Sequence, residues 1–142
     1  LPIDDHRDEI LQHINDHRVT IIHGETGCGK SSRVPLMLLE ELGSGRHGAR
    51  MFVSQPRRIA AKALMDRVRQ ASCEDLIGMR LGHGMRTEGP QTRVWFVTAG
   101  YLVRLLAHHP EAFSEHTHLI IDEVHERSVD TDILCLLAKR LL

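Results

Sequence analysis

Three glycines, a lysine and two serines lie within nine positions of this sequence, directly after a short apolar run. Residues 24–31, GETGCGKS, fit the pattern G-x-x-x-x-G-K-[ST] without a mismatch. A glycine loop between a strand and a helix points successive backbone N–H groups inward, where they bind phosphate oxygens. The alternative, a glycine-rich turn with an exposed lysine, needs a chance match found in about one such chain in a few hundred. We therefore predict that a nucleotide is bound by Gly24, Glu25, Thr26, Gly27, Cys28, Gly29, Lys30, Ser31 and Ser32.

An acidic pair follows a second apolar run much later in the chain, in the stretch LIIDEVHER at 119–127. Asp122 can hold Mg²⁺ together with the Ser31 hydroxyl, and Glu123 can contribute to the metal site and orient an attacking water. Lys30 can reach the β- and γ-phosphates. The alternative is that the two carboxylates only cap the helix that follows. With the glycine loop upstream, the pair predicts a Mg·ATP site that hydrolyses its nucleotide.

The bulk composition is that of an ordinary globular domain. The chain has 142 residues, a net charge of −1, 42% hydrophobic and 26% charged residues, so composition alone predicts no attraction to nucleic acid or membrane. The three cysteines form no CxxC pair, which favours a reduced, intracellular location. We expect no membrane span and no signal peptide. The chain does not begin with methionine, and we expect it to be part of a longer polypeptide.

Apolar periodicity alternates between strand-like and helix-like segments along the whole chain. The predicted strands are 19–23, 51–55, 94–98 and 118–122, and the predicted helices are 5–17, 31–43, 56–68, 101–109 and 129–142. In the third helix we expect one apolar face, made of Ile59, Ala60, Ala63, Leu64 and Val68. Residues 80–92 are too rich in glycine and turn formers to predict regular structure. Alternation of this kind predicts one α/β domain over 1–142, with a parallel sheet covered on both faces.

Four segments together resemble a known family. GETGCGKSS, QPRRIAA, TAGYLVR and DEVHER are similar to motifs I, Ia, Ib and II of the DEAH/RHA helicases, in the family's order. The resemblance covers nearly the whole chain and implies the first RecA-like domain of a P-loop ATPase. It implies that Lys30 is the central cation, that Asp122 and Glu123 serve the metal and the water, and that His125 couples the nucleotide to the facing domain. A histidine that only caps a helix is the alternative for His125.

The resemblance also implies contacts to nucleic acid. Arg57 and Arg58 correspond to residues that touch the backbone of a single strand, and arginines at a helix start suit phosphate binding. Thr98 and Gly100 correspond to a hydroxyl and a close backbone approach to a phosphate. Arg67 corresponds to an arginine that stacks on the nucleotide base. For each of the three arginines, a solvated helix arginine is the alternative.

The sequence departs from the family pattern at two places. Met79 and Gly82 stand where the family usually has an aromatic residue and an arginine, which leaves the local contacts open. The chain ends before any Ser-Ala-Thr motif, so we expect a central strand and the second RecA-like domain to lie outside it, and the chain alone to be monomeric and nearly inactive. The parent protein is predicted to be an ATP-dependent RNA helicase that acts on single-stranded RNA or on duplexes with an overhang, with protein adaptors as further partners. The alternatives are an RNA-binding scaffold that hydrolyses little ATP, and a P-loop motor acting on DNA.

Overall fold

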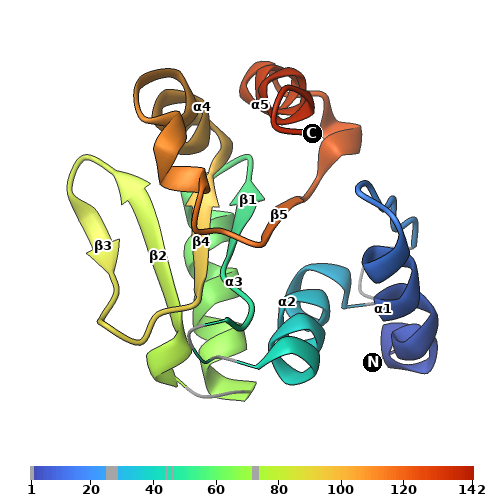
Figure 1. The fold of residues 1–142 in the computed structure, drawn as a ribbon. Coiled ribbons are helices and arrows are strands. Elements are labelled where there is room, and N and C mark those ends of the chain that lie inside the picture. The colour runs from blue at the N-terminus through green and yellow to red at the C-terminus, as the bar shows by residue number, and fades with distance from the viewer. Residues whose placement is uncertain (1, 25–28, 44, 46, 72–73) are drawn as a thin grey trace.

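The computed structural model of the chain describes residues 2–24, 29–43, 45, 47–71 and 74–142 (Figure 1). Its centre is a five-stranded sheet in the order β3-β2-β4-β1-β5. Neighbouring strands are parallel, except that β3 runs antiparallel to β2 at one edge. The strand bounds are β1 Met51–Gln55, β2 Ile77–Gly82, β3 Met85–Thr87, β4 Val94–Thr98 and β5 His118–Ile121.

Helices cover both faces of this sheet. One core cluster joins α1, α2 and α3 to one face, and the other joins α4 and α5 to the opposite face. The two central strands, β1 and β4, are buried along their whole length, as expected for a sheet covered on both sides. The α/β fold predicted from the sequence is thereby confirmed. The α-helices are α1 Arg7–Asp16, α2 Lys30–Leu42, α3 Arg58–Ala71, α4 Ala99–His108 and α5 Val129–Lys139, and the 3₁₀ helices are η1 Pro2–His6, η2 Glu74–Leu76, η3 Pro110–Phe113 and η4 Val124–Glu126.

The hairpin of β2 and β3 corrects the prediction of irregular structure over 80–92. Alternate apolar side chains from Ile77 to Leu81 are buried, so β2 joins the sheet beside β4. The glycines serve the turn that follows: Gly82 and Gly84 have φ of +85° and +79°, and His83 between them has +48°. Glycine adopts this region without steric cost, so the glycine-rich stretch turns the chain at the end of a strand and does not prevent one.

The buried face of α3 also differs from the prediction. Ala61, Met65 and Val68 face the core, whereas Ile59 is 86% exposed and Ala63 is exposed. Ala61, Met65 and Val68 are four and three positions apart, so they form one stripe along the helix. Apolar residues are spread around this helix, and the position of the sheet selects which of them are buried.

Residues 19–23, predicted as a buried strand, form no strand in the structure. Val19 is 56% and Ile21 is 87% exposed. Among the described residues no strand pairs with this segment, and β5 is an edge of the sheet. The segment and β5 line one cleft of about 1210 Å³, together with apolar side chains of α2 and α5. A β-branched run forms a strand only beside a hydrogen-bonding partner.

His116, in the turn before β5, predicts a pH dependence of stability. Its ring stacks on Phe52 at 4.1 Å, and its Nδ1 lies 2.9 Å from the carbonyl oxygen of Ala112. Burial, and then the nearby charge of Arg50, lower the pKa of His116 to about 4. Between about pH 6.5 and pH 4 the unfolded chain therefore binds a proton that the folded chain does not. The free energy of unfolding should fall as the pH drops through this window, with His116 contributing about 1–2 kcal/mol after solvent screening.

Urea unfolding of the wild type and of His116→Gln at both ends of this window measures that contribution. We expect the variant to lose less stability than the wild type on acidification, because the remaining titrating groups are the same in both proteins. His108→Gln is the matched control, since His108 is exposed at the end of α4. Equal pH slopes for wild type and His116→Gln would contradict the prediction.

No helix within the described ranges has both the length and the hydropathy of a membrane-spanning helix.

Candidate active site

The carboxyl ends of three parallel strands meet at one edge of the sheet, and candidate site residues lie at each of them. β1 ends at Gln55, β4 ends at Thr98, and β5 is followed directly by Asp122. Gln55 is in register with Thr98, and the Asp122 backbone N–H donates to the Ser54 carbonyl oxygen at 3.1 Å. Ligands of open α/β sheets bind outside this edge. The topology therefore gathers residues that are far apart in the sequence.

The side chain of Lys30, at the end of the glycine loop, contacts the residue at which the loop begins. The predictions for Glu25, Thr26, Gly27 and Cys28 stay predictions, because residues 25–28 lie outside the described residues. Gly29 has φ of +94° and directly precedes α2, whose first residue is Lys30. The Lys30 ammonium donates to the Gly24 carbonyl oxygen at 2.7 Å. The helix N-terminus and this ammonium form a positive site suited to phosphate.

Ser31 and Asp122 are in direct contact although 91 positions separate them. The Ser31 hydroxyl donates to Asp122 Oδ2, and the Gln55 side-chain amide donates to the same oxygen at 2.5 Å. Hydroxyl and carboxylate oxygens are the donors that Mg²⁺ prefers, so these residues fit the metal ion predicted from the sequence. The sequence analysis missed Gln55. Its signal was a polar residue at the end of a fully buried strand, and Gln55 is only 2% exposed.

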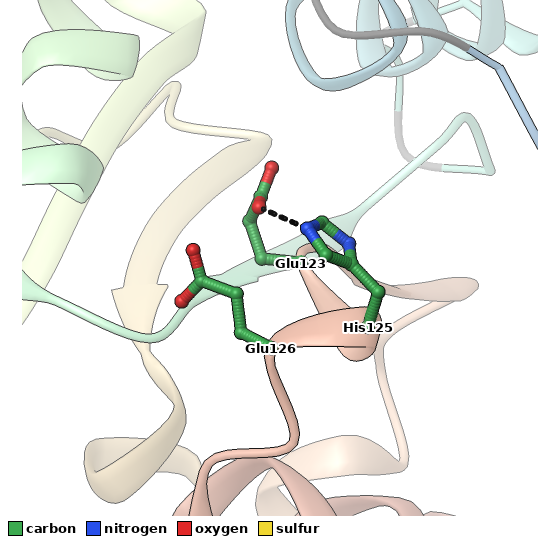
Figure 2. A group of neighbouring side chains, drawn as sticks. All are labelled: Glu123, His125 and Glu126. Atoms are coloured by element: carbon green, nitrogen blue, oxygen red, sulfur yellow. Dashed lines mark ion pairs between the residues drawn. The ribbon is translucent and has the colours of Figure 1, made fainter.

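Glu123, His125 and Glu126 converge on one short turn (Figure 2). Glu123 and Arg127 have φ of +57° and +53°, and the single 3₁₀ turn η4 lies between them. Non-glycine residues in this region are strained, and such residues cluster at functional sites as well as in turns. Figure 2 shows His125 turned toward Glu123, with Nε2 3.3 Å from Oε2. The His125 side chain is 75% exposed, so it is open to a group that approaches from outside.

Arg57 links the start of α3 to this turn. Its guanidinium donates to Glu126 Oε2 at 2.9 Å, and the Arg57 side chain is 69% exposed. Arg58, the first residue of α3, is exposed as well. Arg67 lies nine residues after Arg58, which places it about 13 Å further along α3 and on the opposite side of the helix from Arg58. The structure therefore brings Arg57 next to the acidic turn but does not bring Arg67 to the two other arginines.

Thr98 and Gly100 lie at the start of α4. The Thr98 hydroxyl accepts a hydrogen bond from the Tyr101 backbone N–H at 3.2 Å, and Thr98 is 8% exposed. This hydroxyl is a helix cap, a role that the sequence analysis did not include. A Cβ atom on Gly100 would lie 3.0 Å from Asp130 Oδ2. Glycine therefore lets the Asp130 carboxylate lie close to the helix start.

The chain is similar to helicases over nearly its whole length. The sequence profile of the DEAD/DEAH box helicase family matches residues 4–141. The human ATP-dependent RNA helicase DHX30 is 42% identical over 147 residues, which cover 99% of this chain and 12% of that protein. The probable ATP-dependent RNA helicase spindle-E of Aedes aegypti is 37% identical over 145 residues, which cover 100% of this chain and 10% of that protein.

A solved structure shows the same fold. The crystal structure of the Escherichia coli DEAH/RHA helicase HrpB superposes on 99% of this chain with a TM-score of 0.88 and 30% sequence identity. The match covers 18% of that helicase. The chain thus spans between 10% and 18% of the length of these three relatives.

Proposed function

Because the chain belongs to the DEAD/DEAH box helicase family, we propose that residues 1–142 are part of the first RecA-like domain of an ATP-dependent RNA helicase of the DEAH/RHA type. ATP hydrolysis by the parent protein drives translocation on single-stranded RNA and the remodelling of duplexes or RNA–protein complexes. The observation that supports this most directly is the contact between Ser31 and Asp122. It joins the phosphate-binding loop to the acidic motif in one site.

The proposed ATP chemistry depends on six residues. Lys30 turns from the Gly24 carbonyl oxygen to the terminal phosphates, and Ser31 and Asp122 hold the metal ion through oxygen atoms. Mg²⁺, when bound, neutralises negative charge on the β- and γ-phosphates. Glu123 orients the attacking water and accepts its proton, and His125 beside it transmits the state of the nucleotide to a second RecA-like domain. Gln55 holds the Asp122 carboxylate in place.

The proposed RNA-binding residues lie at the starts of α3 and α4. Arg57 and Arg58 bind backbone phosphates, and the backbone at Thr98 and Gly100 approaches the strand closely. These contacts read no bases, because phosphates carry no sequence information. RNA recognition by this domain is therefore largely independent of sequence.

The ion pair of Arg57 and Glu126 links a proposed RNA-binding residue to the acidic turn beside the ATP site. It supports a specific prediction. A phosphate and the Glu126 carboxylate compete for the same guanidinium, so Glu126→Gln should free Arg57 and strengthen RNA binding about two- to fivefold, as for an exposed ion pair. Fluorescence anisotropy with a labelled uridine oligonucleotide measures the change in Kd. Glu74→Gln is the matched control: it removes another arginine–glutamate pair of 2.9 Å at the far end of α3. Equal Kd values for the wild type and Glu126→Gln would show that this pair does not limit RNA binding.

Steady-state ATP hydrolysis by the full-length protein tests the function. We expect single-stranded RNA to raise the turnover number and single-stranded DNA of the same sequence to raise it less. Hydrolysis that RNA does not change would contradict the proposal and favour a nucleotide-gated scaffold, and equal stimulation by DNA would favour a DNA motor.

A further inference from the structure

We propose that Gln55 is a positioning residue that couples the Asp122 carboxylate to the RNA-binding arginine Arg57. Its contact with Asp122 is one end of a two-point clamp, and the ion pair of Arg57 and Glu126 is the other end. The inference rests on the proposed function. It names the contacts through which the ATP site and an RNA-binding residue of this domain affect each other.

The first contact of the clamp lies at the carboxyl end of β1. The Gln55 amide donates to Asp122 Oδ2 at 2.5 Å, and the Ser31 hydroxyl donates to the same oxygen. Gln55 is 2% exposed, so water does not replace this partner when the contact is lost. A buried hydrogen bond to a charged group is among the stronger ones in a protein. A change at Asp122 Oδ2 therefore acts directly on Gln55.

The second contact lies two residues further along the chain. The Arg57 guanidinium donates to Glu126 Oε2 at 2.9 Å. The Arg57 carbonyl oxygen accepts from the Ala61 backbone N–H at 3.1 Å, which fixes Arg57 at the start of α3. Only Pro56 separates Arg57 from Gln55, and its ring restricts the backbone between them. The end of β1 and the start of α3 are thus joined by a short and stiff connection.

Both partners of this connection belong to one short stretch, residues 122–126. Asp122 directly follows β5, and Glu126 ends the turn η4. The Glu126 backbone N–H donates to the Glu123 carbonyl oxygen at 3.1 Å, so the turn is closed by its own hydrogen bond. Residues 55–57 and 122–126 therefore contact each other at two points. A displacement at one contact is transmitted to the other, because both segments between the contacts are short.

Each contact also uses a group to which a ligand is proposed to bind. A metal ion at Asp122 brings a large positive charge to the carboxylate that accepts from Gln55, and it competes with that amide. An RNA phosphate competes with Glu126 for the Arg57 guanidinium. Both ligands therefore favour the open clamp. Two ligands that shift one equilibrium in the same direction strengthen each other's binding, and they do so reciprocally.

Fluorescence anisotropy with a labelled uridine oligonucleotide and the full-length protein tests the inference. The Kd is measured without nucleotide and with a saturating non-hydrolysable ATP analogue and Mg²⁺. We expect Gln55→Leu to lower the Kd without nucleotide about two- to fivefold, because the open clamp releases Arg57 from an exposed ion pair. The ratio of the Kd without nucleotide to the Kd with nucleotide should fall by the same factor, since the clamp no longer links the two ligands.

Ser54→Ala is the matched control. Ser54 precedes Gln55 in β1 and is 1% exposed, and its hydroxyl has no hydrogen-bond partner among the described residues. This substitution therefore alters the same buried strand and leaves the clamp intact. A residue that only supports the fold would weaken RNA binding when it is replaced. Tighter RNA binding after the loss of a buried side chain is the result that a structural role does not give.

The double variant Gln55→Leu/Glu126→Gln tests whether the two contacts act as one unit. Each single substitution opens the same clamp from a different end. The double variant should therefore bind RNA no more tightly than the tighter of the two single variants. If the two contacts were independent, their effects on Kd would multiply, and that result would contradict the clamp.

Gln55→Asn decides the question if Gln55→Leu does not fold. Asparagine keeps the amide but is one methylene shorter, so the contact with Asp122 is lost while the buried group stays polar. We expect the same fall in the Kd without nucleotide and in the ratio of the two Kd values. Thermal unfolding of each variant shows which of them are folded.

The outcomes separate this inference from the function beneath it. If the wild type binds RNA and hydrolyses ATP in response to it, while the folded Gln55 variants match Ser54→Ala in both Kd values, the inference is overturned and the function stands. Weaker RNA binding by the Gln55 variants without nucleotide would overturn it as well. If the wild type itself does not bind single-stranded RNA, the proposed function fails, and the inference fails with it.

Discussion

Glu123→Gln is expected to lower the ATP turnover number of the full-length protein by about 10²- to 10⁴-fold, the usual contribution of a positioned proton acceptor. Glutamine keeps the size and the hydrogen-bonding capacity of the side chain but cannot accept a proton from water. The constrained backbone at Glu123, with φ of +57°, holds the side chain beside His125. Nucleotide affinity should change little, because Ser31 and Asp122 make the contact between the glycine loop and the acidic motif, and Glu123 does not take part in it.

Glu115→Gln is the matched control for this experiment. Glu115 is exposed and precedes β5, whereas Glu123 follows the same strand. Each substitution therefore removes one negative charge, and the two positions lie at opposite ends of β5. Single-turnover hydrolysis, measured with and without RNA, separates chemistry from product release. A turnover number for Glu123→Gln within twofold of that for Glu115→Gln would exclude Glu123 as the water-activating residue.

Lys30→Ala is expected to weaken ATP binding roughly ten- to a hundredfold and to abolish measurable hydrolysis. Hydrogen bonds that involve a charged group contribute about 1.5–3 kcal/mol, and each 1.4 kcal/mol changes Kd tenfold. The Lys30 ammonium contacts the Gly24 carbonyl oxygen at 2.7 Å, which places its charge where the loop begins. Its loss removes the central positive charge of the site.

Titration with a fluorescent ATP analogue measures the change in affinity. Lys62→Ala provides the control, because Lys62 is an exposed lysine on α3 whose ammonium pairs with Asp66 at 3.1 Å. Retention of wild-type nucleotide affinity by Lys30→Ala would contradict the assignment of the glycine loop as the phosphate site.

Most of the succession of elements could be predicted from the sequence. The helix that begins beside Lys30 and ends before Gly43, and the buried strands β1 and β4, were all predicted, because local apolar periodicity and glycine stop signals are properties of short segments. The convergence of Ser31 and Asp122 was predicted too, because a phosphate-binding loop needs an acidic partner for its metal ion and the motif that begins at Asp122 supplies one. That prediction needed only residue types and the order of the motifs.

The errors have one physical cause, which is that local pattern does not specify partners. Residues 19–23 have the composition of a strand, yet Ile21 is 87% exposed, and no strand in the described part of the chain pairs with this segment. Ile59 belongs to an apolar periodic set, yet α3 buries Met65 and leaves Ile59 in solvent. In both cases the burial of a side chain depends on which surface lies opposite, and that surface is built by distant parts of the chain.

The sequence by itself determined that this chain is an α/β domain with a phosphate-binding loop and an acidic partner motif, because these depend on residue type and spacing. Only the tertiary structure decided which side chains are in contact: Gln55 with Asp122, and Arg57 with Glu126. Each of these contacts joins separate elements whose relative placement follows from packing. Contacts of a few ångströms depend on strand order and helix placement, which no short segment encodes.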